Sequence, residues 1–595
     1  MPPHRLEFGS SVAVRLIGWA HRLEFGSSVA VRLIGWAHRL EFGSSVAVRL
    51  IGSKFDAFAA FSLGSERNFR VDYLALVVGY SVEFSKDPLG QRSSSKSQIK
   101  SQTKMLNLIV SLSLLCAVGG YVLPNIVVIL SDDQDVELHG MFPLQETMNL
   151  IGRAGAQFNN AYTSTPLCCP ARASILTGQY AHNHRTTNNS LSGGCNSQLW
   201  KTRSEPRAMP VLLAERGYRT FYAGKYLNEF QGEHVPPGWT EFHGLHGNSR
   251  YYNYTLLQNG RNVSYTDTYL TDLLSDLAVD FIQQEVQWKR MNPFFVMLAP
   301  PAAHAPYTPA PRHEGTFAKW KALRTPSFNV PTKDKHWLVG SSKVLPNETI
   351  ATIDKYFQKR WESLLAVDEM VSTLVALLND TQLLDNTYFV YTSDNGYHLG
   401  QFSQPFDKRQ PYETDIRVPL LVRGPGIAKG SDIQSVVSLI DLAPTIITWA
   451  NALIPSYMDG RSFNQNLQNA QPNGIDETYK RHLLIEYWGE GNYKTYNPEC
   501  PGSPKDRLAQ CTSDADCHCQ DAWNNTYVCV RDFQYKVDRI YCEFRDTENT
   551  LEAYDLKEDP YQIKNIAYDL LPIERALYDI MLQNLTKCSG HSCNL

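Results

Sequence analysis

Two apolar runs, each ended by acidic residues, constrain the fold of this chain more than any other feature. The first is NIVVIL at 125–130, followed by SDD at 131–133, and the second is TYFVYTS at 387–393, followed by DN at 394–395. Continuous runs of β-branched and aromatic residues are typical of strands that are buried on both faces of a sheet. The two runs therefore predict central strands with acidic side chains at their carboxyl ends.

Helical patterns alternate with strand-like runs along the chain. Further buried strands are predicted at 219–225, 294–299 and 418–424, and helices at 143–155, 209–218, 268–284, 355–378 and 439–450. The segment from about 156 to Cys168 reads as a loop. Strands that alternate with helices predict an α/β fold, with a mostly parallel central sheet flanked by helices. Ligands bind such sheets beyond the carboxyl ends of the strands, where both acidic clusters would lie.

The sequence changes character after about residue 455. Residues 456–480 are polar and loop-like, and shorter strand patterns and one helical pattern follow at 482–489, 526–537, 541–546 and 573–585. We expect 480–595 to form a smaller C-terminal α+β subdomain. A larger α/β domain, in which both acidic clusters lie, would then cover 121–479.

Eight of the twelve cysteines lie from Cys500 onward. Such crowding late in a secreted chain is typical of a disulfide-rich subdomain. The pair Cys517-x-Cys519 could also suggest metal binding, but no further His/Cys cluster surrounds it. Disulfides are therefore favoured, and the pairing among the eight residues stays open.

The first 104 residues contain an unusual repeat. The 17-residue sequence HRLEFGSSVAVRLIGWA occurs twice from His4, and a third copy begins at His38. The period is short for the common repeat folds and the copies are identical, so we expect 1–104 to be a misassigned or disordered extension. The alternative is a genuine amphipathic repeat. A short apolar run closed by small residues follows at 105–120 and predicts a secretory signal peptide.

Charge and hydropathy exclude two kinds of partner. Lys and Arg total 56 against 60 Asp and Glu, a net charge of −4, so no basic excess points to nucleic acid. After residue 120 no apolar stretch reaches the roughly 20 residues that span a bilayer.

Asn-x-Ser/Thr sequons, which mark glycoproteins of the secretory pathway, occur at Asn188, Asn253, Asn262, Asn347, Asn379, Asn524 and Asn584.

The segment CCPARASILTG, which begins at Cys168, resembles the C-x-P-S/A-R and T-G signature of the type I sulfatases. The resemblance implies the alkaline phosphatase-like sulfatase fold and the oxidation of Cys168 to formylglycine by the formylglycine-generating enzyme. Arg172 fits the recognition element of that motif. The alternative is that Cys168 and Cys169 are disulfide-forming neighbours. For Cys169 a disulfide is the favoured interpretation, with Cys195 as a plausible partner.

Formylglycine explains why a cysteine stands at this position. In the family, one hydroxyl of the aldehyde hydrate attacks sulfur to give a covalent sulfated enzyme, and the second hydroxyl then expels sulfate. If ASILTG belongs to a helix, Cys168 lies at its N-terminal end. Free N–H groups and the helix dipole favour a bound oxyanion there, typically by ~0.3–1 kcal/mol.

The two acidic clusters supply oxygen ligands for a cation. Asp132, Asp133, Asp394 and Asn395 suit Ca²⁺ or Mg²⁺ rather than zinc, because they include no His or Cys. All four match the metal positions of the sulfatases, where calcium is usual. The resemblance places Cys168, as formylglycine, at the same metal.

Three further positions match the family and one departs from it. Lys225 and Lys408 match sulfate-binding lysines, and His304 matches the histidine that protonates the leaving oxygen. Many sulfatases read G-K-x-H, with the His helping to eliminate sulfate, but Leu227 occupies that place here. His398, which follows the second acidic cluster, is the candidate for this missing base.

Segments such as GKYLNEF, HVPPGW and TSDNGYHLGQF resemble the lysosomal branch of the family, which removes the 6-sulfate of N-acetylglucosamine from heparan and keratan sulfate. The resemblance implies a sulfated glycosaminoglycan substrate and a lysosomal or secreted protein. Related extracellular endosulfatases carry a long basic insertion, whereas 456–480 is short and nearly uncharged. A phosphate-ester hydrolase would be expected to carry a Ser or Thr nucleophile and zinc ligands. If Cys168 is unmodified, the alternative is a non-catalytic glycan-binding glycoprotein.

Overall fold

The computed structural model describes residues 122–594 except 289–291, 470–480, 492–496, 501–506, 516 and 535–536, and the backbone of six short strands between 13 and 60. Two units divide at Gly119, and each is described by itself. In the first, β1 Ala13–Ile17, β3 Ala30–Ile34 and β5 Ala47–Gly52 pair in parallel, so that the identical repeats stack in register. The predicted signal peptide and the predicted boundary at 479–480 lie outside the described residues, so the domain division stays a prediction.

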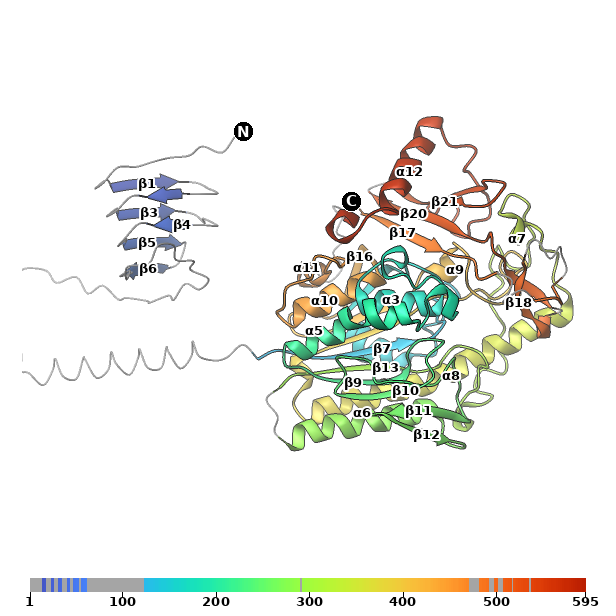
Figure 1. Cartoon of the computed structure of the whole chain (residues 1–595), viewed down its shortest axis with the longest axis horizontal. Coiled ribbons are helices and arrows are strands. Elements are labelled where there is room, and N and C mark those ends of the chain that lie inside the picture. The colour runs from blue at the N-terminus through green and yellow to red at the C-terminus, as the bar shows by residue number, and fades with distance from the viewer. Residues whose placement is uncertain are drawn as a thin grey trace, which may run out of the picture. The chain divides into compact units, whose positions relative to one another are not determined.

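A ten-stranded sheet forms the centre of the second unit (Figure 1). Its order is β12-β11-β10-β9-β13-β7-β14-β15-β8-β16. The strands are β7 Asn125–Ser131, β8 Ala156–Tyr162, β9 Arg219–Lys225, β10 Glu241–Leu245, β11 Tyr254–Gln258, β12 Arg261–Tyr265, β13 Phe294–Ala299, β14 Thr387–Ser393, β15 Leu420–Arg423 and β16 Ser431–Ser438. The middle of the sheet, from β10 to β14, is parallel. The predicted α/β class is therefore confirmed, with antiparallel pairs toward both edges that make the sheet mixed.

Helices cover both faces of this sheet (Figure 1). The helices of this part of the chain are α2 Gln145–Thr147, α3 Cys168–Thr177, α4 Ala181–His184, α5 Met209–Glu215, α6 Leu270–Gln287, α7 Trp337–Gly340, α8 Asn347–Asp380, α9 Glu413–Ile416, α10 Leu442–Trp449 and α11 Asn464–Asn469, with a π-helical turn at Met148–Arg153. Of these, α7 packs against the C-terminal strands (Figure 1). None of the helices in the described residues has the length and apolar content needed to span a membrane.

The alternation of side chains in β7 explains why this strand lies in the middle. Val128 packs into a core that includes residues of α3, α5 and α10, whereas Val127 and Ile129 pack into a second core with α6 and α8. Successive side chains of a strand point to opposite faces, so a strand covered on both sides must be apolar throughout. All seven residues of β7 are buried.

The register between β7 and β14 joins the two acidic clusters. These strands pair in parallel with Ser131 opposite Ser393, the last residue of each strand. Asp132 and Asp394 therefore leave the sheet side by side. The expectation that both clusters meet at the carboxyl ends of the strands is confirmed.

Several edge elements differ from the sequence-based expectation. The segment 156–162, expected as a loop, forms β8, because its apolar residues alternate with polar ones on a strand near the edge of the sheet. The predicted strand at 418–424 is confirmed as β15, but it runs antiparallel to both of its neighbours. The strands β10, β11, β12 and β16 were not predicted, because their patterns are short and largely polar.

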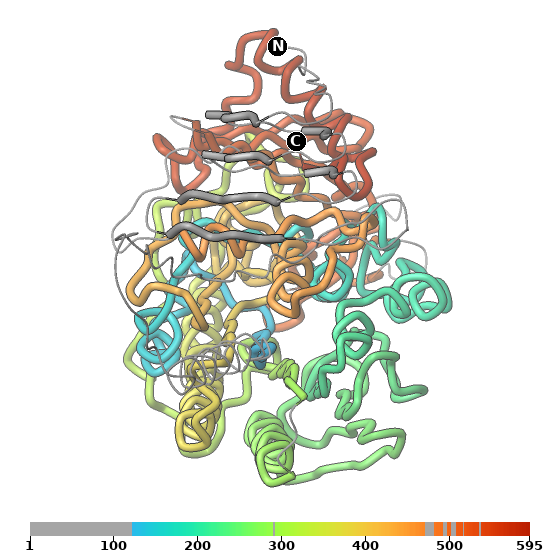
Figure 2. The backbone as a smooth tube through the Cα atoms, turned by 90° about the vertical axis from the view of Figure 1, so that its left-hand side faces the viewer, coloured from blue at the N-terminus to red at the C-terminus, as the bar shows by residue number. Residues whose placement is uncertain are grey.

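The C-terminal subdomain is a four-stranded antiparallel sheet with one long helix. Its order is β17-β20-β21-β22, with β17 Arg481–Tyr487, β20 Tyr527–Gln534, β21 Val537–Phe544, β22 Leu551–Asp555 and the helix α12 Pro572–Leu585. One face of this sheet packs against Tyr162 and Ile416 of the larger domain, and the other face packs against α12. Both views place α12 and α6 at opposite ends of the unit (Figures 1 and 2).

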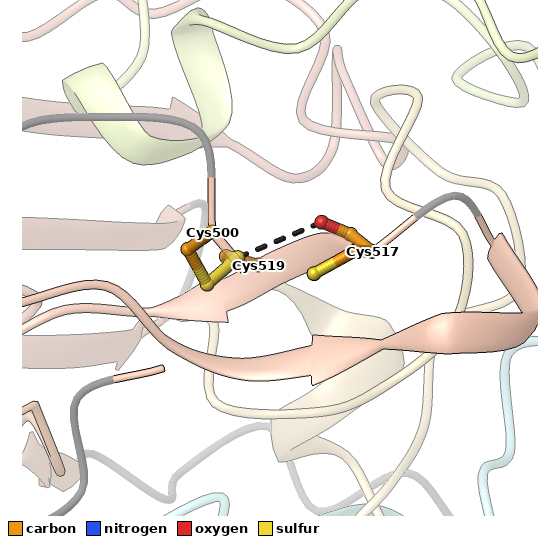
Figure 3. Close-up of side chains that lie close together, drawn as sticks. All are labelled: Cys500, Cys517 and Cys519. Atoms are coloured by element: carbon orange, nitrogen blue, oxygen red, sulfur yellow. Dashed lines mark hydrogen bonds between the residues drawn. A yellow bond between two sulfur atoms is a disulfide. The ribbon is translucent and has the colours of Figure 1, made fainter. Parts of the chain in front are cut away.

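All eight late cysteines form disulfides, as expected. The pairs are Cys500–Cys519, Cys511–Cys517, Cys529–Cys542 and Cys588–Cys593. Figure 3 shows the first pair beside Cys517, whose carbonyl oxygen lies 3.6 Å from Sγ of Cys519. Because these sulfurs are already bonded in pairs, they are not thiolate ligands for a metal. The disulfide Cys169–Cys195 is also present, which leaves Cys168 as the free thiol among the cysteines of the described residues.

His182 connects the larger domain to the C-terminal subdomain. Its Nδ1 lies 3.0 Å from Oε1 of Glu486 on β17, and its Nε2 lies 3.0 Å from the carbonyl oxygen of Cys588. Burial alone would lower the pKa of His182, but the hydrogen bond to Glu486 and its charge outweigh burial and raise it. Only the protonated ring donates from both nitrogens, so the cation fits this junction best.

We expect replacement of His182 by Gln to remove a pH-dependent part of the stability. The group has a folded-state pKa above its unfolded value of about 6.5, so its contribution is complete below that pH and is lost as pH rises through the folded-state value. The melting temperature of the wild type should thus fall more between about pH 5 and 8 than that of His182→Gln. His591→Gln, at an exposed histidine, is the control. Identical pH profiles for the wild type and His182→Gln would contradict this prediction.

Candidate active site

The predicted site residues come from separate elements and meet at one edge of the sheet. Asp132 and Asp133 follow β7, Asp394 and Asn395 follow β14, and Lys225 ends β9. The remaining members are His304 after β13, Cys168 and Arg172 on α3, and Lys408 in the segment before α9. One ligand atom from each of Asp132, Asp133, Cys168 and His304 lies within 4.8 Å of the others. The structure therefore places these residues in one buried cluster.

Asp132 is held by two cations and a hydroxyl group. Its carboxylate oxygens accept from Nζ of Lys225 at 2.7 and 3.0 Å, and Arg172 lies 3.3 Å away. The hydroxyl of Ser249 also donates to this carboxylate. Burial would raise the pKa of Asp132, but Lys225 and the neighbouring cations hold it well below its usual range. Asp132 is therefore an anion in this cluster.

Asp133 is the residue that links the cluster together. Its backbone, with φ of 59°, lies in the left-handed region, and its N–H donates to Oδ1 of Asp394 at 3.0 Å. Its carboxylate accepts from Nζ of Lys408 at 2.6 Å and from Nδ2 of Asn395 at 2.8 Å. Asp tolerates the left-handed region better than most residues do. The turn thus aims one carboxylate at donors from two segments, Lys408 and Asn395.

Cys168 and His304 face the same carboxylate of Asp133. Sγ of Cys168 lies 3.8 Å from Oδ1, and Nε2 of His304 lies 3.8 Å from Oδ2. Nδ1 of His304 is 2.6 Å from the carbonyl oxygen of Ala305, which fixes Nδ1 as the donor and leaves Nε2 toward the cluster. Burial lowers the pKa of His304 to about 4 and raises the pKa of the Cys168 thiol to about 12. A thiol with this pKa is a poor nucleophile.

Arg172 ties α3 to the ends of two strands, and a glycine allows the close approach at the end of β9. Nε of Arg172, one turn into α3, donates to Asp394 at 2.8 Å, and its guanidinium also donates to the carbonyl oxygen of Lys225 at 2.7 Å. Gly224 has φ of 116°, and a Cβ there would lie 2.1 Å from the carbonyl oxygen of Ala299. Only glycine therefore fits before Lys225, which accounts for the G-K sequence.

The buried charges of the cluster balance without any ion. Asp132, Asp133 and Asp394 face Lys225, Lys408 and Arg172, and each of the six is nine-tenths buried or more. The pKa of Asp394 is raised to about 7, mainly by burial and also by the two neighbouring aspartates, although Arg172 opposes this shift. A divalent cation would relieve this crowding and would leave two positive charges for an anionic ester.

The donor set fits a hard divalent cation. Oδ1 of Asn395 is buried and has no hydrogen-bond partner, although its amide nitrogen is bound to Asp133. A buried carbonyl oxygen without a partner is costly, and an ion among the carboxylates would satisfy it. Oxygen ligands of this kind suit Ca²⁺ or Mg²⁺. Asp135 and Glu137 lie apart from the set, since they pair with Arg360 and Arg417.

A cavity of about 420 Å³ opens beside the cluster and is lined by Asp133, His304 and Lys408. Its volume falls near the lower end of the ~300–1,000 Å³ of small-molecule sites. Its remaining walls combine aromatic residues with hydrogen-bonding groups; they include Tyr307, Tyr397, Phe406, Asn228, Asn248, Asp407, Arg409 and Glu490. This lining suits a polar ligand with both ring faces and hydroxyl groups, in addition to an anionic end.

The sequence did not single out most of these cavity residues. Asp407 and Arg409 flank Lys408 directly, so their position beside a predicted lysine was an available signal. Glu490 lies in a loop apart from the predicted motifs and carried no comparable signal. Its place in the site follows only from the folded chain.

His398 has partners outside the cluster. Its Nδ1 lies 3.0 Å from Asp415, and its Nε2 lies 3.4 Å from Oε1 of Gln520 in the C-terminal subdomain. Burial lowers its pKa, but Asp415 outweighs burial and raises it. His398 is not among the residues that line the cavity. Leu227 is fully buried in the apolar core beneath the site. The elimination role expected of His398 stays a prediction.

The sulfatase family model matches residues 124–452, and the chain belongs to the sulfatase family. It is a sulfuric ester hydrolase by this membership. Human N-acetylglucosamine-6-sulfatase is 46% identical over 483 residues, which cover 79% of this chain and 86% of the human protein. The extracellular sulfatase SULF-1 homolog of Drosophila melanogaster is 41% identical over 371 residues, which cover 62% of this chain but 33% of that protein.

A solved structure of an enzyme in complex with its substrate D-glucosamine-2-N,6-O-disulfate shares the fold. Its TM-score is 0.61 at 23% identity, and the alignment covers 78% of this chain and 97% of that one. The likeness supports the sulfatase fold that the sequence predicts.

We expect Asp394→Asn to weaken divalent cation binding. The substitution keeps the size and polarity of the side chain but removes one of three carboxylate charges, and ligand charge tunes calcium affinity. Calcium per chain, measured by mass spectrometry after dialysis, should fall from about one to near zero. If some calcium remains, the affinity of the protein for calcium should be at least ~10-fold weaker. Glu137→Gln is the control, because Glu137 pairs with Arg417 outside the cluster. Equal calcium content in the wild type and Asp394→Asn would remove this residue from the ligand set.

Proposed function

We propose that this sulfatase removes the 6-sulfate from N-acetylglucosamine at the ends of glycosaminoglycan chains such as heparan and keratan sulfate. The observation that carries the proposal is the cavity, whose lining joins Asp133, His304 and Lys408 of the charged cluster to aromatic and hydrogen-bonding groups. A sulfated sugar carries an anionic ester, which suits the lysine, and hydroxyl groups and ring faces, which suit the hydrogen-bonding and aromatic side chains. The similarity to the human N-acetylglucosamine-6-sulfatase over most of both chains supports this choice.

Cys168 is the proposed nucleophile position after conversion to formylglycine. The formylglycine-generating enzyme would act on the chain before it folds, because the thiol is fully buried in the structure. The hydrated aldehyde supplies a hydroxyl group that the thiol cannot. The raised pKa of Cys168 agrees with this need, since the unmodified side chain stays protonated at neutral pH.

The surrounding side chains have separate roles in this proposal. Lys225 and Lys408 bind sulfate oxygens, and Arg172 holds Asp394 and the end of β9 in place. Any proton that His304 gives to the leaving oxygen moves through Nε2, because Nδ1 is fixed by Ala305. Asp132, Asp133, Asp394 and Asn395, together with the modified residue 168, would hold Ca²⁺, which supplies positive charge against the sulfate.

A lysosomal location and terminal action are further parts of the proposal. The disulfides agree with folding in an oxidising compartment. The chain covers 86% of the human relative but 33% of the extracellular Drosophila protein, which favours the first as a guide to the whole molecule. The segment 456–480 also carries no basic insertion.

We expect Cys168→Ala to abolish turnover while the fold is kept. Loss of the nucleophile should lower the hydrolysis rate of N-acetylglucosamine 6-sulfate by at least ~10³-fold, as for other essential catalytic groups. Sulfate release should be measured on protein secreted from eukaryotic cells, with thermal unfolding as the check on folding. Mass spectrometry of the peptide that contains residue 168 shows whether the wild type carries the aldehyde. Unchanged turnover in Cys168→Ala would refute the assigned nucleophile.

We expect the enzyme to release sulfate only from a terminal sugar. Two oligosaccharides of equal length, with the 6-sulfated N-acetylglucosamine either at the non-reducing end or internal, form the matched pair. Sulfate should be released at least ~100-fold faster from the terminal position. Comparable rates on both would instead favour the endosulfatase alternative.

A further inference from the structure

The cavity beside the sulfate cluster has a wall that comes from the C-terminal subdomain. The hairpin of β18 Ala509–Thr512 and β19 His518–Asp521 contributes Gln510 and Thr512 to the lining. These two residues stand in the same cavity as Asp133 and Lys408, although they are more than 100 residues away in the sequence. A segment that is distant in the sequence thus forms part of the lining of the site.

The hairpin is held rigidly by covalent and buried contacts. The disulfide Cys511–Cys517 links β18 to the residue before β19. The disulfide Cys500–Cys519 joins β19 to a residue outside the hairpin (Figure 3). Gln520 is fully buried, and its carbonyl oxygen accepts from Nε2 of Gln410 at 3.4 Å. Binding residues on a rigid support lose little conformational freedom when a ligand arrives.

His398 takes part in this anchoring. Its Nε2 lies 3.4 Å from Oε1 of Gln520, while its Nδ1 is held by Asp415. The hydroxyl of Tyr356 on α8 donates to Asp514 at the tip of the hairpin. The hairpin is therefore attached to the larger domain at its base and at its tip, and the segment between these points faces the cavity.

The lining of the cavity combines a cation with neutral polar groups. Lys408 supplies a positive charge, whereas Gln510 and Thr512 offer a neutral amide and a hydroxyl group. Gln510 is exposed and donates to Glu490 at 3.4 Å, and Glu490 also pairs with Arg409 at 2.9 Å. Neutral donors and acceptors suit hydroxyl and N-acetyl groups of a sugar rather than sulfate.

We propose that Gln510 and Thr512 of the disulfide-bonded hairpin form a sugar subsite, which binds the polar groups of the substrate remote from its 6-sulfate. The subsite rests on the proposed function, because it assumes a sulfated sugar in the cavity. It determines affinity for the glycan and takes no part in the cleavage of the sulfate ester. The disulfide Cys511–Cys517 keeps both side chains at their positions.

The test separates recognition of the sugar from recognition of sulfate. The KM for N-acetylglucosamine 6-sulfate and the inhibition constant of inorganic sulfate are measured for Gln510→Ala, Thr512→Val and their combination. Each lost hydrogen bond, worth about 0.5–1.5 kcal/mol, should raise KM roughly 2- to 10-fold. The inhibition constant of sulfate should not change. Ser513→Ala, an exposed hairpin residue that does not line the cavity, is the matched control.

The disulfide provides a second, independent variant. Replacement of both Cys511 and Cys517 by Ser should raise KM in the same direction without a change in the inhibition constant of sulfate. An unchanged KM in the combined Gln510→Ala and Thr512→Val variant would overturn the subsite. A parallel rise in both constants would also overturn it, since that result indicates a general disturbance of the fold.

Failure of the proposed function gives a different result. In that case the wild type itself does not hydrolyse N-acetylglucosamine 6-sulfate, whereas failure of the subsite leaves wild-type turnover intact. Calorimetric titration of Cys168→Ala protein with the same sugar sulfate then decides whether the hairpin binds it. Weaker binding in the combined variant supports the subsite, and equal binding refutes it.

Discussion

Burial of three carboxylates at one edge of the sheet is the constraint on which the rest of this structure depends. A buried carboxylate without a partner is costly, so each must meet a cation or a hydrogen-bond donor. Lys225, Lys408 and Arg172 supply these charges from β9, from the segment before α9 and from α3. Because the three cations come from separate parts of the chain, the network also fixes how those parts are arranged. With a divalent cation bound, the same arrangement would carry a net positive charge, which would attract an anionic ester.

The C-terminal subdomain completes the site instead of standing apart from it. Arg531 of β20 is buried and binds both Glu413 of α9 and the hydroxyl of Tyr162. This ion pair joins the small sheet to the segment that carries Lys408. Glu490 follows β17 and pairs with Arg409 beside that lysine. Most of the residues that line the cavity therefore belong to the larger domain, and the smaller one adds Glu490, Gln510 and Thr512.

Local patterns predicted the central elements well, because these are buried on two faces. The runs at 125–130, 219–225, 294–299 and 387–393 match β7, β9, β13 and β14 closely. The edge strand β16 and its neighbour β8 were missed, since half-polar sequences such as AQFNNAY also suit loops. The motif at Cys168 and the two acidic clusters predicted residues that the fold brings into one buried cluster. The cavity residues of the smaller domain had no such motif, and their backbone positions depend on contacts across hundreds of residues.

The sequence by itself determined the α/β class, the sulfatase family and the charged residues of the cluster, because short motifs and strand periodicity encode these locally. Only the tertiary structure decided the disulfide pairing of the late cysteines, since many pairings are compatible with the same spacing. It also decided the surroundings of His398, whose ring nitrogens contact Asp415 and Gln520. The wall formed by Gln510 and Thr512 belongs to this second group. The physical reason is that packing brings together residues that no local periodicity relates.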